Sequence, residues 1–540
     1  MTLTRRDALK LGGLSALGLG ALGLPLGGGA SAAAASQLAP ADFPSFYAAP
    51  FRKPVARTPV MQDGVATYDF TARLTPAARV LPRLTTGIYG YDGTFPGPLI
   101  ELDQGVPSRV RIRNHMPTTG PFGSLSRLST HLHGSASLPE YDGYASDVTP
   151  VGHYKDYLYP NFQAARTLWY HDHGVHWTAQ QAYGGLAAMY VLHDPTERAL
   201  LPQGRFDVPL MVNDALFQAN GQLLYDDNSR SGLWGDVLLV NGTPWPRMQV
   251  QRRTYRFRIL NCSISRSYQW RLSGGLPMQV VATDGGLVPK GVAVKSMRHA
   301  VAERYEVVVD FSKVPAGTTM VELFNDSNKN NIDFPTTNRV MAFELTDEPV
   351  DKTDPTWNQD YDRLALAPSE VMSLPTNCRY PRRTFAVERN DLTGLWTFGG
   401  QSWQDVVASG YTRVLGDPQA GGVEVWDIEN RSGGWFHPVH IHLVDFRIIG
   451  RSGGSGGILP YEEGPKDVVY VGESETVSLL VKFAVSPGTD GGHYMVHCHN
   501  LPHEDHDMMA QFRVGVPSLA SDPHHPLLKA PSVPDPTYRA

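Results

Sequence analysis

The sequence predicts an all-β protein built from three β-sandwich domains. A chain of 540 residues is too long for one hydrophobic core, and the usual size of a domain favours three. Short runs of β-branched and aromatic residues recur between Gly, Pro, Asn and Asp breaks, a pattern typical of sandwiches. The 53 glycines and 42 prolines agree with a chain rich in turns.

Three runs show the predicted strands most clearly, at residues 108–113, 254–259 and 306–310. The first two alternate apolar with charged residues. Because neighbouring side chains of a strand point to opposite faces, this alternation predicts strands with one buried face.

Breaks in composition divide the chain into three blocks, called here the first, middle and third block. Turn-forming and polar stretches mark the two divisions, near residues 195–204 and from residue 347 onwards. The predicted boundaries are 40–195 for the first block, 200–346 for the middle block, 347–379 for a linker and 380–516 for the third block. A Pro-rich tail at 517–540 is expected to be extended or loosely packed, with His524 and His525 facing solvent.

The N-terminal segment, residues 1–36, resembles a twin-arginine export signal. Arg5-Arg6 precede an apolar run that ends in the small-x-small pattern Ala30-Ser31-Ala32. We therefore expect recognition by the twin-arginine export machinery, cleavage, and a periplasmic or extracellular protein without stable membrane insertion. An uncleaved anchor is the alternative, but many glycines and Pro25 weaken a spanning helix.

Charge and cysteine content exclude nucleic-acid-binding proteins and proteins with a dense disulfide framework. A formal charge of −6 provides no basic stripe to neutralise a phosphate backbone, so nucleic acid is not an expected partner. Three cysteines exclude a dense disulfide framework, although Cys262 and Cys378 either pair or remain buried thiols. We expect a monomer.

Four His-x-His pairs carry the strongest chemical signal in the chain. Residues two apart on a strand project from one face, so each pair offers two imidazoles to one metal cluster. A single pair often forms only hydrogen bonds, but four pairs use 8 of the 19 histidines, which chance explains poorly. The pairs are His131 and His133, His171 and His173, His440 and His442, and His497 and His499.

Cys498 lies between two of these histidines and must therefore point to the opposite face of the same strand. His437, three residues before His440, tends to face the same side as Cys498, and His503 and Met508 follow downstream. Two imidazoles, a thiolate and a weak axial thioether form the ligand set of a blue-copper centre. Taken singly, Cys498 is a buried hydrophobe and Met508 a core filler. A zinc site would leave the other eight histidines unexplained.

The chain resembles the multicopper oxidase family along nearly its whole mature length, and most of all bilirubin oxidases and bacterial spore-coat-type laccases. The resemblance implies three cupredoxin-like Greek-key β-sandwich domains. It rests on residues 95–98 (FPGP), 131–135 (HLHGS), 169–173 (WYHDH), 234–236 (WGD), 435–446 (WFHPVHIHLVDF) and 497–509 (HCHNLPHEDHDMM).

The resemblance also implies four copper ions, one of type 1, one of type 2 and two of type 3. The implied ligands are His437, Cys498, His503 and axial Met508 for type 1; His131 and His440 for type 2; and His133, His171 and His499, with His173, His442 and His497, for the type 3 pair. The first and third blocks supply four trinuclear ligands each, so the cluster is expected at their interface. The middle block supplies none and acts as a spacer.

Three further residues are candidates for catalytic roles. By resemblance, Asp142 and Glu504 are proton carriers beside the trinuclear cluster; otherwise they are a turn aspartate before Gly143 and a surface glutamate. Trp435, two residues before His437, either borders the copper edge where a donor docks or serves only packing.

The function implied is a laccase-like or bilirubin-oxidase-like oxidase. It would couple one-electron oxidation of a small phenolic, aminophenolic or tetrapyrrole donor to four-electron reduction of O₂ to water. A cuprous or other metal-ion oxidase is one alternative, but the 14 methionines form no cluster apart from Met508-Met509. A copper-free exported cupredoxin scaffold is another, and all twelve ligand positions are occupied.

Overall fold

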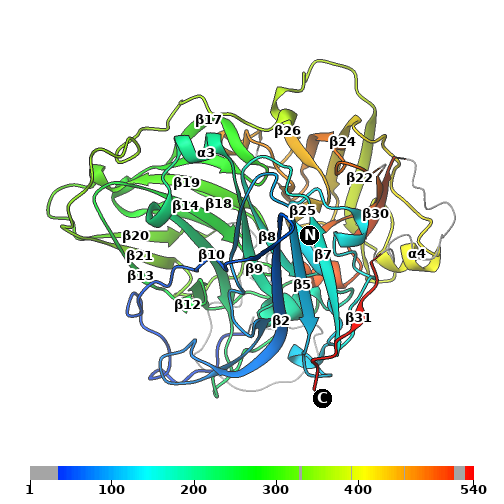
Figure 1. Ribbon diagram of the computed structural model, residues 1–540, viewed down its shortest axis with the longest axis horizontal. Helices are drawn as coiled ribbons and strands as arrows, with labels where there is room; N and C mark the ends of the chain where they lie inside the picture. The colour runs from blue at the N-terminus through cyan, green and yellow to red at the C-terminus, as the bar shows by residue number, and fades with distance from the viewer. Residues whose placement is uncertain are drawn as a thin grey trace, which may run out of the picture.

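The computed structural model describes residues 34–327, 331–390, 392–454, 456–489, 491–515 and 530–539. Within these residues, six β-sheets form three sandwiches of two sheets each, so the all-β class is confirmed. In Figure 1 the first block (blue to cyan) lies below the centre, the middle block (green) at the left and the third block (yellow to orange) at the upper right. The predicted export signal lies outside the described residues.

The first block pairs a sheet of six strands with a sheet of four. The larger sheet contains β1 (Val60–Gln62), β2 (Val65–Ala78), β3 (Thr86–Tyr91), β5 (Ser108–Asn114), β7 (His153–Tyr159) and β31 (Val533–Pro534). The smaller sheet contains β4 (Ile100–Asp103), β6 (Thr130–His133), β8 (Arg166–Asp172) and β9 (Ala187–His193). Side chains of both sheets, among them Ile112 and Leu168, share one buried core.

The middle block pairs a sheet of seven strands with a sheet of five. The larger sheet contains β10 (Asp207–Ala215), β11 (Val237–Val240), β12 (Thr243–Pro244), β14 (Thr254–Asn261), β16 (Met278–Thr283), β17 (Gly286–Val294) and β19 (Arg304–Asp310). The smaller sheet contains β13 (Arg247–Val250), β15 (Tyr268–Leu272), β18 (Met297–His299), β20 (Met320–Asn325) and β21 (Arg339–Leu345).

The third block pairs a sheet of five strands with a sheet of four. The larger sheet contains β22 (Arg382–Arg389), β23 (Trp396–Phe398), β24 (Val423–Asn430), β26 (Asp445–Ser452) and β28 (Thr476–Lys482). The smaller sheet contains β25 (His437–Ile441), β27 (Val468–Val471), β29 (Gly492–Cys498) and β30 (Met509–Val514). Trp426 and Val496, from opposite sheets, belong to one core.

Each block repeats one strand arrangement, in which an early strand runs parallel to a later strand of the same sheet. The parallel pairs are β2 with β5, β10 with β14 and β22 with β24. Parallel neighbours need a crossover connection. In the first and middle blocks the crossover includes a strand of the second sheet, β4 and β13 respectively, whereas in the third block it contains β23 of the same sheet. The described helices are short: α2 (Thr178–Gly184), α3 (Pro195–Leu200), α4 (Trp403–Ala408) and α5 (Leu501–Asp505). None of these helices has the length and apolar character that crossing a membrane requires.

Strand β14 departs from the predicted alternation because its charged face is also buried. Arg256 and Arg258 are each 1% exposed, although β5 alternates as predicted. Arg258 bonds Glu306 of β19 at 2.8 Å, and α3 covers the same face with Glu197. Burial opposes ionisation of Glu306, but Arg256 and Arg258 outweigh it and lower its pKa to about 2. Ion pairing thus explains how charged residues occupy this buried face.

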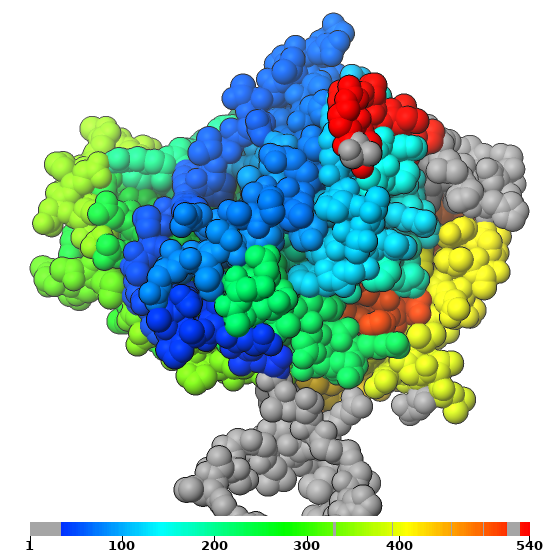
Figure 2. Space-filling view, turned by 90° about the horizontal axis from the view of Figure 1, so that it is seen from below, coloured from blue at the N-terminus to red at the C-terminus, as the bar shows by residue number. Residues whose placement is uncertain are grey.

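The end of the chain packs on the first block. Val533–Pro534 form β31 beside β7, and the Asp535 carboxylate accepts hydrogen bonds from Arg113 and His115. Figure 2 shows these red residues lying on the blue-to-cyan surface of the first block. Residues 530–539 are therefore extended but not loosely packed, whereas His524 and His525 lie outside the described residues. Cys262 and Cys378 are not joined by a disulfide, and the alternative of two buried thiols is wrong because Cys378 is exposed and Cys262 is only partly buried.

Candidate metal centres

Eight imidazoles converge where the first block meets the third. Antiparallel pairing aligns His131 of β6 with His171 of β8, and His440 of β25 with His497 of β29. The four His-x-His pairs therefore approach one another from two blocks, as the sequence predicts. All eight side chains are 0–1% exposed: His131, His133, His171, His173, His440, His442, His497 and His499.

The imidazoles fall into groups of three whose ring nitrogens lie within 4.8 Å of one another. The groups are His131 with His440 and His442, His133 with His171 and His499, and His173 with His442 and His497. Two of them coincide with the two type 3 sets implied by the sequence, and the first contains both residues of the implied type 2 set.

The ring nitrogens inside this cluster face one another, and within the described residues no hydrogen-bond donor or acceptor oxygen lies between them. Nε2 of His497 lies 3.1 Å from Nε2 of His442 and 3.2 Å from Nε2 of His173, and Nε2 of His131 lies 3.4 Å from that of His440. No partner in the described structure contacts His133 Nδ1, His171 Nε2 or either ring nitrogen of His499. Converging lone pairs of this kind fit metal ions.

Several of the nitrogens that point away from the cluster are held by oxygen atoms. Nδ1 of His171 donates to the backbone oxygen of Asp172 at 2.8 Å, and Nδ1 of His440 donates to that of Asp467 at 2.9 Å. Such outer hydrogen bonds fix the tautomer and leave the inner nitrogen free to bind a metal.

Burial also keeps the following imidazoles of the cluster in the neutral form that ligates metals. Burial, reinforced by neighbouring imidazoles, lowers the pKa of His171 to about 3 and that of His173 to about 4. The same causes hold the pKa well below its ordinary value at His131, His133, His440, His442 and His499.

A second group lies on the other face of β29, where the sequence places Cys498. Nδ1 of His437 lies 3.4 Å from Sγ of Cys498, and Nδ1 of His503 lies 3.7 Å from it. Burial raises the pKa of the Cys498 thiol, so a cation must be present for the thiolate to form there. Met508 shares the buried core of Cys498, whereas Met509 belongs to a different core.

Asp142 is a buried residue in contact with the histidine cluster. Its carboxylate accepts a hydrogen bond from His442 Nδ1 at 2.8 Å, and it is 1% exposed. Burial raises the pKa of this carboxyl well above its ordinary value. Gly143, at φ +77°, allows the close approach, because a Cβ there would lie 2.5 Å from Cα of His131.

Glu504 is also buried, at 3% exposure, so the surface alternative is wrong. Its carboxylate lies 2.9 Å from Nδ1 of His497 and 3.5 Å from Nδ1 of His173. Burial opposes its ionisation, but the two imidazoles outweigh burial and lower its pKa to about 2. Asp142 and Glu504 thus contact different imidazoles of one cluster.

Trp435 is half-buried and stacks on Trp234 of the middle block, with ring centroids 5.5 Å apart. The indole that contacts the second group is Trp396, which stacks on His503 at 4.1 Å and meets His437 edge-on at 5.4 Å. No motif in the sequence marks Trp396, because β23 is separated from both histidines along the chain.

Asp467 is a second residue of the site that the sequence does not predict. Its carboxylate lies 3.1 Å from Nε2 of His133 and binds Arg304 of the middle block at 2.6 Å. Lys466, next in the chain, reaches back to Asp284 at 2.9 Å and Glu303 at 3.0 Å. The middle block supplies no imidazole to the groups above, yet its Arg304 supports an aspartate that contacts one of them. No local motif marked this role.

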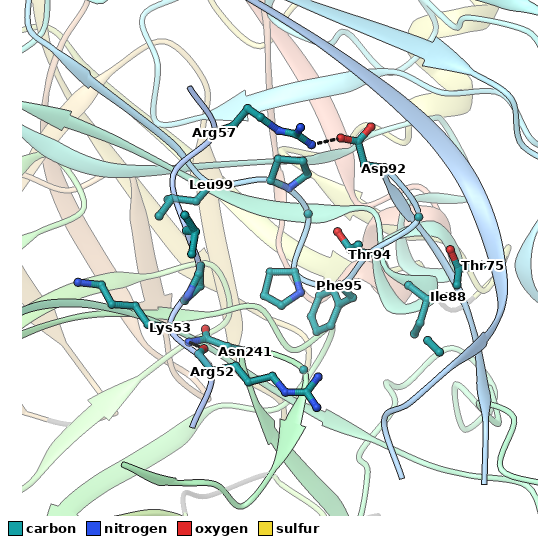
Figure 3. A pocket seen from close by; sticks show the side chains of 18 of the residues that line it. Arg52, Lys53, Arg57, Thr75, Ile88, Asp92, Thr94, Phe95, Leu99 and Asn241 are labelled. Carbon is teal, nitrogen blue, oxygen red and sulfur yellow. Dashed lines mark hydrogen bonds and ion pairs between the residues drawn. The ribbon is translucent and has the colours of Figure 1, made fainter. Parts of the chain in front are cut away.

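A large cavity lies elsewhere in the described part of the chain. It has a volume of about 910 Å³ and contains none of the histidines above. Figure 3 shows Phe95 between Arg52 and the ion pair of Arg57 with Asp92. The chemistry of the histidine cluster therefore does not depend on this cavity.

Comparison with known proteins identifies relatives along most of the chain. Models of the multicopper oxidase family match residues 75–197, 169–341 and 384–518. The chain is 40% identical to the bilirubin oxidase of Albifimbria verrucaria, over 81% of this chain and 75% of that protein. It is 31% identical to the laccase of Bacillus subtilis strain 168, over 81% of this chain and 91% of that protein.

Solved structures give the same result. The laccase from Pediococcus acidilactici Pa5930 superposes with a TM-score of 0.74 at 28% identity, covering 89% of this chain and 96% of that chain. The multicopper oxidase McoA from Aquifex aeolicus gives 0.71 at 28% identity, covering 86% and 100%. Together with the strand pairing, these matches confirm the cupredoxin-like architecture.

Asp467→Asn should lower the affinity of the cluster for copper by about 10- to 100-fold, because the amide is a weaker acceptor for the His133 N–H. Competition with a chelator, followed by copper quantification, measures this change. Asp445→Asn is the matched control, since Asp445 forms a similar two-point pair with Arg166 at 2.7 and 3.0 Å. Equal copper affinity in both variants would show that Asp467 does not support the cluster.

Proposed function

Because the chain belongs to the multicopper oxidase family, we propose that it holds four copper ions in two centres and oxidises small organic donors. Membership makes the protein a copper-dependent oxidase that uses O₂. The observation that carries the detailed proposal is the convergence of neutral, buried imidazoles with unpartnered inner nitrogens on one face of β29, opposite a buried Cys498.

We assign type 1 copper to His437, Cys498 and His503, with Met508 as the axial ligand. Type 2 copper is assigned to His131 and His440. The type 3 pair is assigned to His133, His171 and His499 and to His173, His442 and His497. The short distances within these groups support the assignment, as does the shared core of Cys498 and Met508.

Copper, when bound, supplies the one-electron redox chemistry and the binding of O₂. The chain keeps the two copper centres apart and connects them through β29. His437 and His503 would hold the copper that faces the donor, and Asp142 and Glu504 stand beside imidazoles that would hold the trinuclear copper. Cys498 is covalently linked to His497 and His499, so β29 joins the two centres directly. Donor and O₂ therefore need not meet.

We propose phenols, aminophenols and tetrapyrroles as donors. The bilirubin oxidase and laccase relatives support these classes. Electron transfer from a donor outside the copper sphere demands little shape recognition, so one site accommodates all three. The half-buried Trp435, stacked on Trp234, is proposed to border the donor position.

Cys498→Ser should abolish the blue absorption and the oxidation of every donor while much of the trinuclear copper remains bound. The reason is that the blue band arises from the copper–thiolate bond. Spectra, copper content and rates with bilirubin, a dimethoxyphenol, an o-aminophenol and Cu(I) test this expectation. The wild type should consume one O₂ for every four electrons withdrawn.

Cys262→Ser is the matched control and should remain blue and active, because Cys262 only donates a weak hydrogen bond to Val212. A blue Cys498→Ser protein would contradict the type 1 assignment. A wild type that oxidises Cu(I) but none of the organic donors would make it a cuprous oxidase.

We further propose that Asp142 and Glu504 deliver protons for the reduction of O₂ to water. Each carboxyl group is buried and contacts an outer ring nitrogen of the cluster, which supports this role. Without such groups, protons would have no route into a site that excludes bulk water.

Asp142→Asn should keep the blue colour and the anaerobic reduction by donor but slow reoxidation by O₂. The amide keeps the size of the side chain and removes its exchangeable carboxyl proton. The slowing should be greatest at high pH, where free protons are scarce, and stopped-flow reoxidation at two pH values measures it. Asp172→Asn is the control, since that buried carboxylate accepts only backbone N–H groups. Equal reoxidation of Asp142→Asn and wild type at both pH values would refute the role.

Export by the twin-arginine route remains a proposal, supported by Arg5-Arg6 ahead of the apolar run. Replacing both arginines with lysine should leave the protein in the cytoplasm, because the receptor recognises arginine itself. Cell fractionation with an antibody checks this outcome, and Lys10→Arg serves as the control. Normal export of the double-lysine variant would mean that another route is used.

A further inference from the structure

The outer edge of His437 is covered by a serine hydroxyl. Nδ1 of His437 faces Cys498 and lies 3.3 Å from Nδ1 of His503, so its Nε2 points the opposite way. There, Nε2 lies 2.8 Å from Oγ of Ser432. His437 is fully buried and Ser432 is half-buried, so an approaching donor meets Ser432 before it meets the imidazole.

The direction of this hydrogen bond follows from the neighbours of Ser432. Its hydroxyl donates to Oδ1 of Asn430 at 2.7 Å, and its backbone N–H donates to the same oxygen at 3.0 Å. A hydroxyl has a single proton to donate, so Oγ must accept at His437. A neutral imidazole that offers Nδ1 to a metal carries its proton on Nε2, which makes His437 the donor.

Asn430 holds this arrangement in place. It is 5% exposed, and its amide donates to the backbone oxygens of Trp435 at 2.6 Å and Gly472 at 2.8 Å. All its polar atoms are therefore used within the third block. The amide cannot turn over without losing these bonds, and the Ser432 hydroxyl stays oriented towards His437.

The second imidazole of the centre has a different cover. Nε2 of His503 lies 3.1 Å from Nδ2 of Asn500 and 3.2 Å from the backbone oxygen of Ser231 in the middle block, and Trp396 stacks on its ring. The acceptor oxygen at Nε2 of His437 belongs to a side chain, whereas the acceptor oxygen at Nε2 of His503 belongs to the backbone. A single substitution can therefore remove the acceptor at His437 without changing the backbone.

We infer that Ser432 is a positioning residue of the donor site. Its hydroxyl holds Nε2 of His437 and thereby sets the redox potential of the type 1 centre. The inference rests on the proposed function. An acceptor at Nε2–H makes the imidazole a stronger ligand, which favours the oxidised ion and lowers the midpoint potential. Removal of the acceptor raises that potential.

Ser432→Ala should shift the midpoint potential of the blue centre upwards, with copper content and blue absorption retained. Ser432→Gly, beside Gly433 and Gly434, should raise the midpoint potential in the same way. Ser432→Thr keeps a hydroxyl and should have the midpoint potential of the wild type. Spectroelectrochemical titration of the blue band in the fully loaded protein measures all three. If the alanine variant fails to fold, the glycine variant decides the question in its place.

Ser312→Ala is the matched control, since Ser312 bonds Asp310 through N at 3.0 Å and Oγ at 2.6 Å in the same kind of turn. Its potential should not move. Wild-type potentials in blue Ser432→Ala and Ser432→Gly proteins would overturn the inference and leave the proposed function intact. A wild type without a blue band would instead overturn the proposed function.

Discussion

The buried ion pairs between the middle and third blocks are the interaction on which the histidine cluster depends. Lys466 enters the middle block to meet Asp284 and Glu303, and Asp467 receives Arg304 from it. Removing one partner of such a pair costs roughly 3–5 kcal/mol, because the other is left charged and unpaired. The pairs therefore fix how the middle and third blocks dock. Asp467 of the third block extends that constraint to His133 of the first block.

Rigid docking matters because the cluster is assembled across an interface. Four imidazoles lie on β6 and β8 of the first block or directly after these strands. The other four lie on β25 and β29 of the third block or directly after them. Their inner nitrogens approach to within 3.1–3.4 Å, an arrangement that is unfavourable unless a cation lies between them. The close approach of these nitrogens lowers the stability of the folded protein. The ion pairs and the outer hydrogen bonds offset this destabilisation.

Strand β29 connects this cluster to the group around Cys498. The surroundings of that group come from several parts of the chain: Trp396 on β23, Ser231 and Trp234 of the middle block, and Ser432 in the turn before Trp435. The middle block consequently takes part in both centres through side chains or backbone atoms that bind no metal. The middle block therefore supports Asp467 and covers His503.

The sequence by itself determined the features that depend on local periodicity and spacing. The two-residue repeat of a strand placed the histidine pairs on one face and Cys498 on the other, and composition and turn residues predicted three sandwiches. It could not predict Asp467, Arg304, Trp396 or Ser432, because each acts through a partner that only the packing of strands and blocks brings near. It also misjudged β14, where Arg256 and Arg258 look solvent-facing until Glu306 and Glu197 are brought against them. Tertiary structure alone decides such pairings, since a buried charge or hydrogen bond depends on what faces it across an interface and not on its neighbours in the chain.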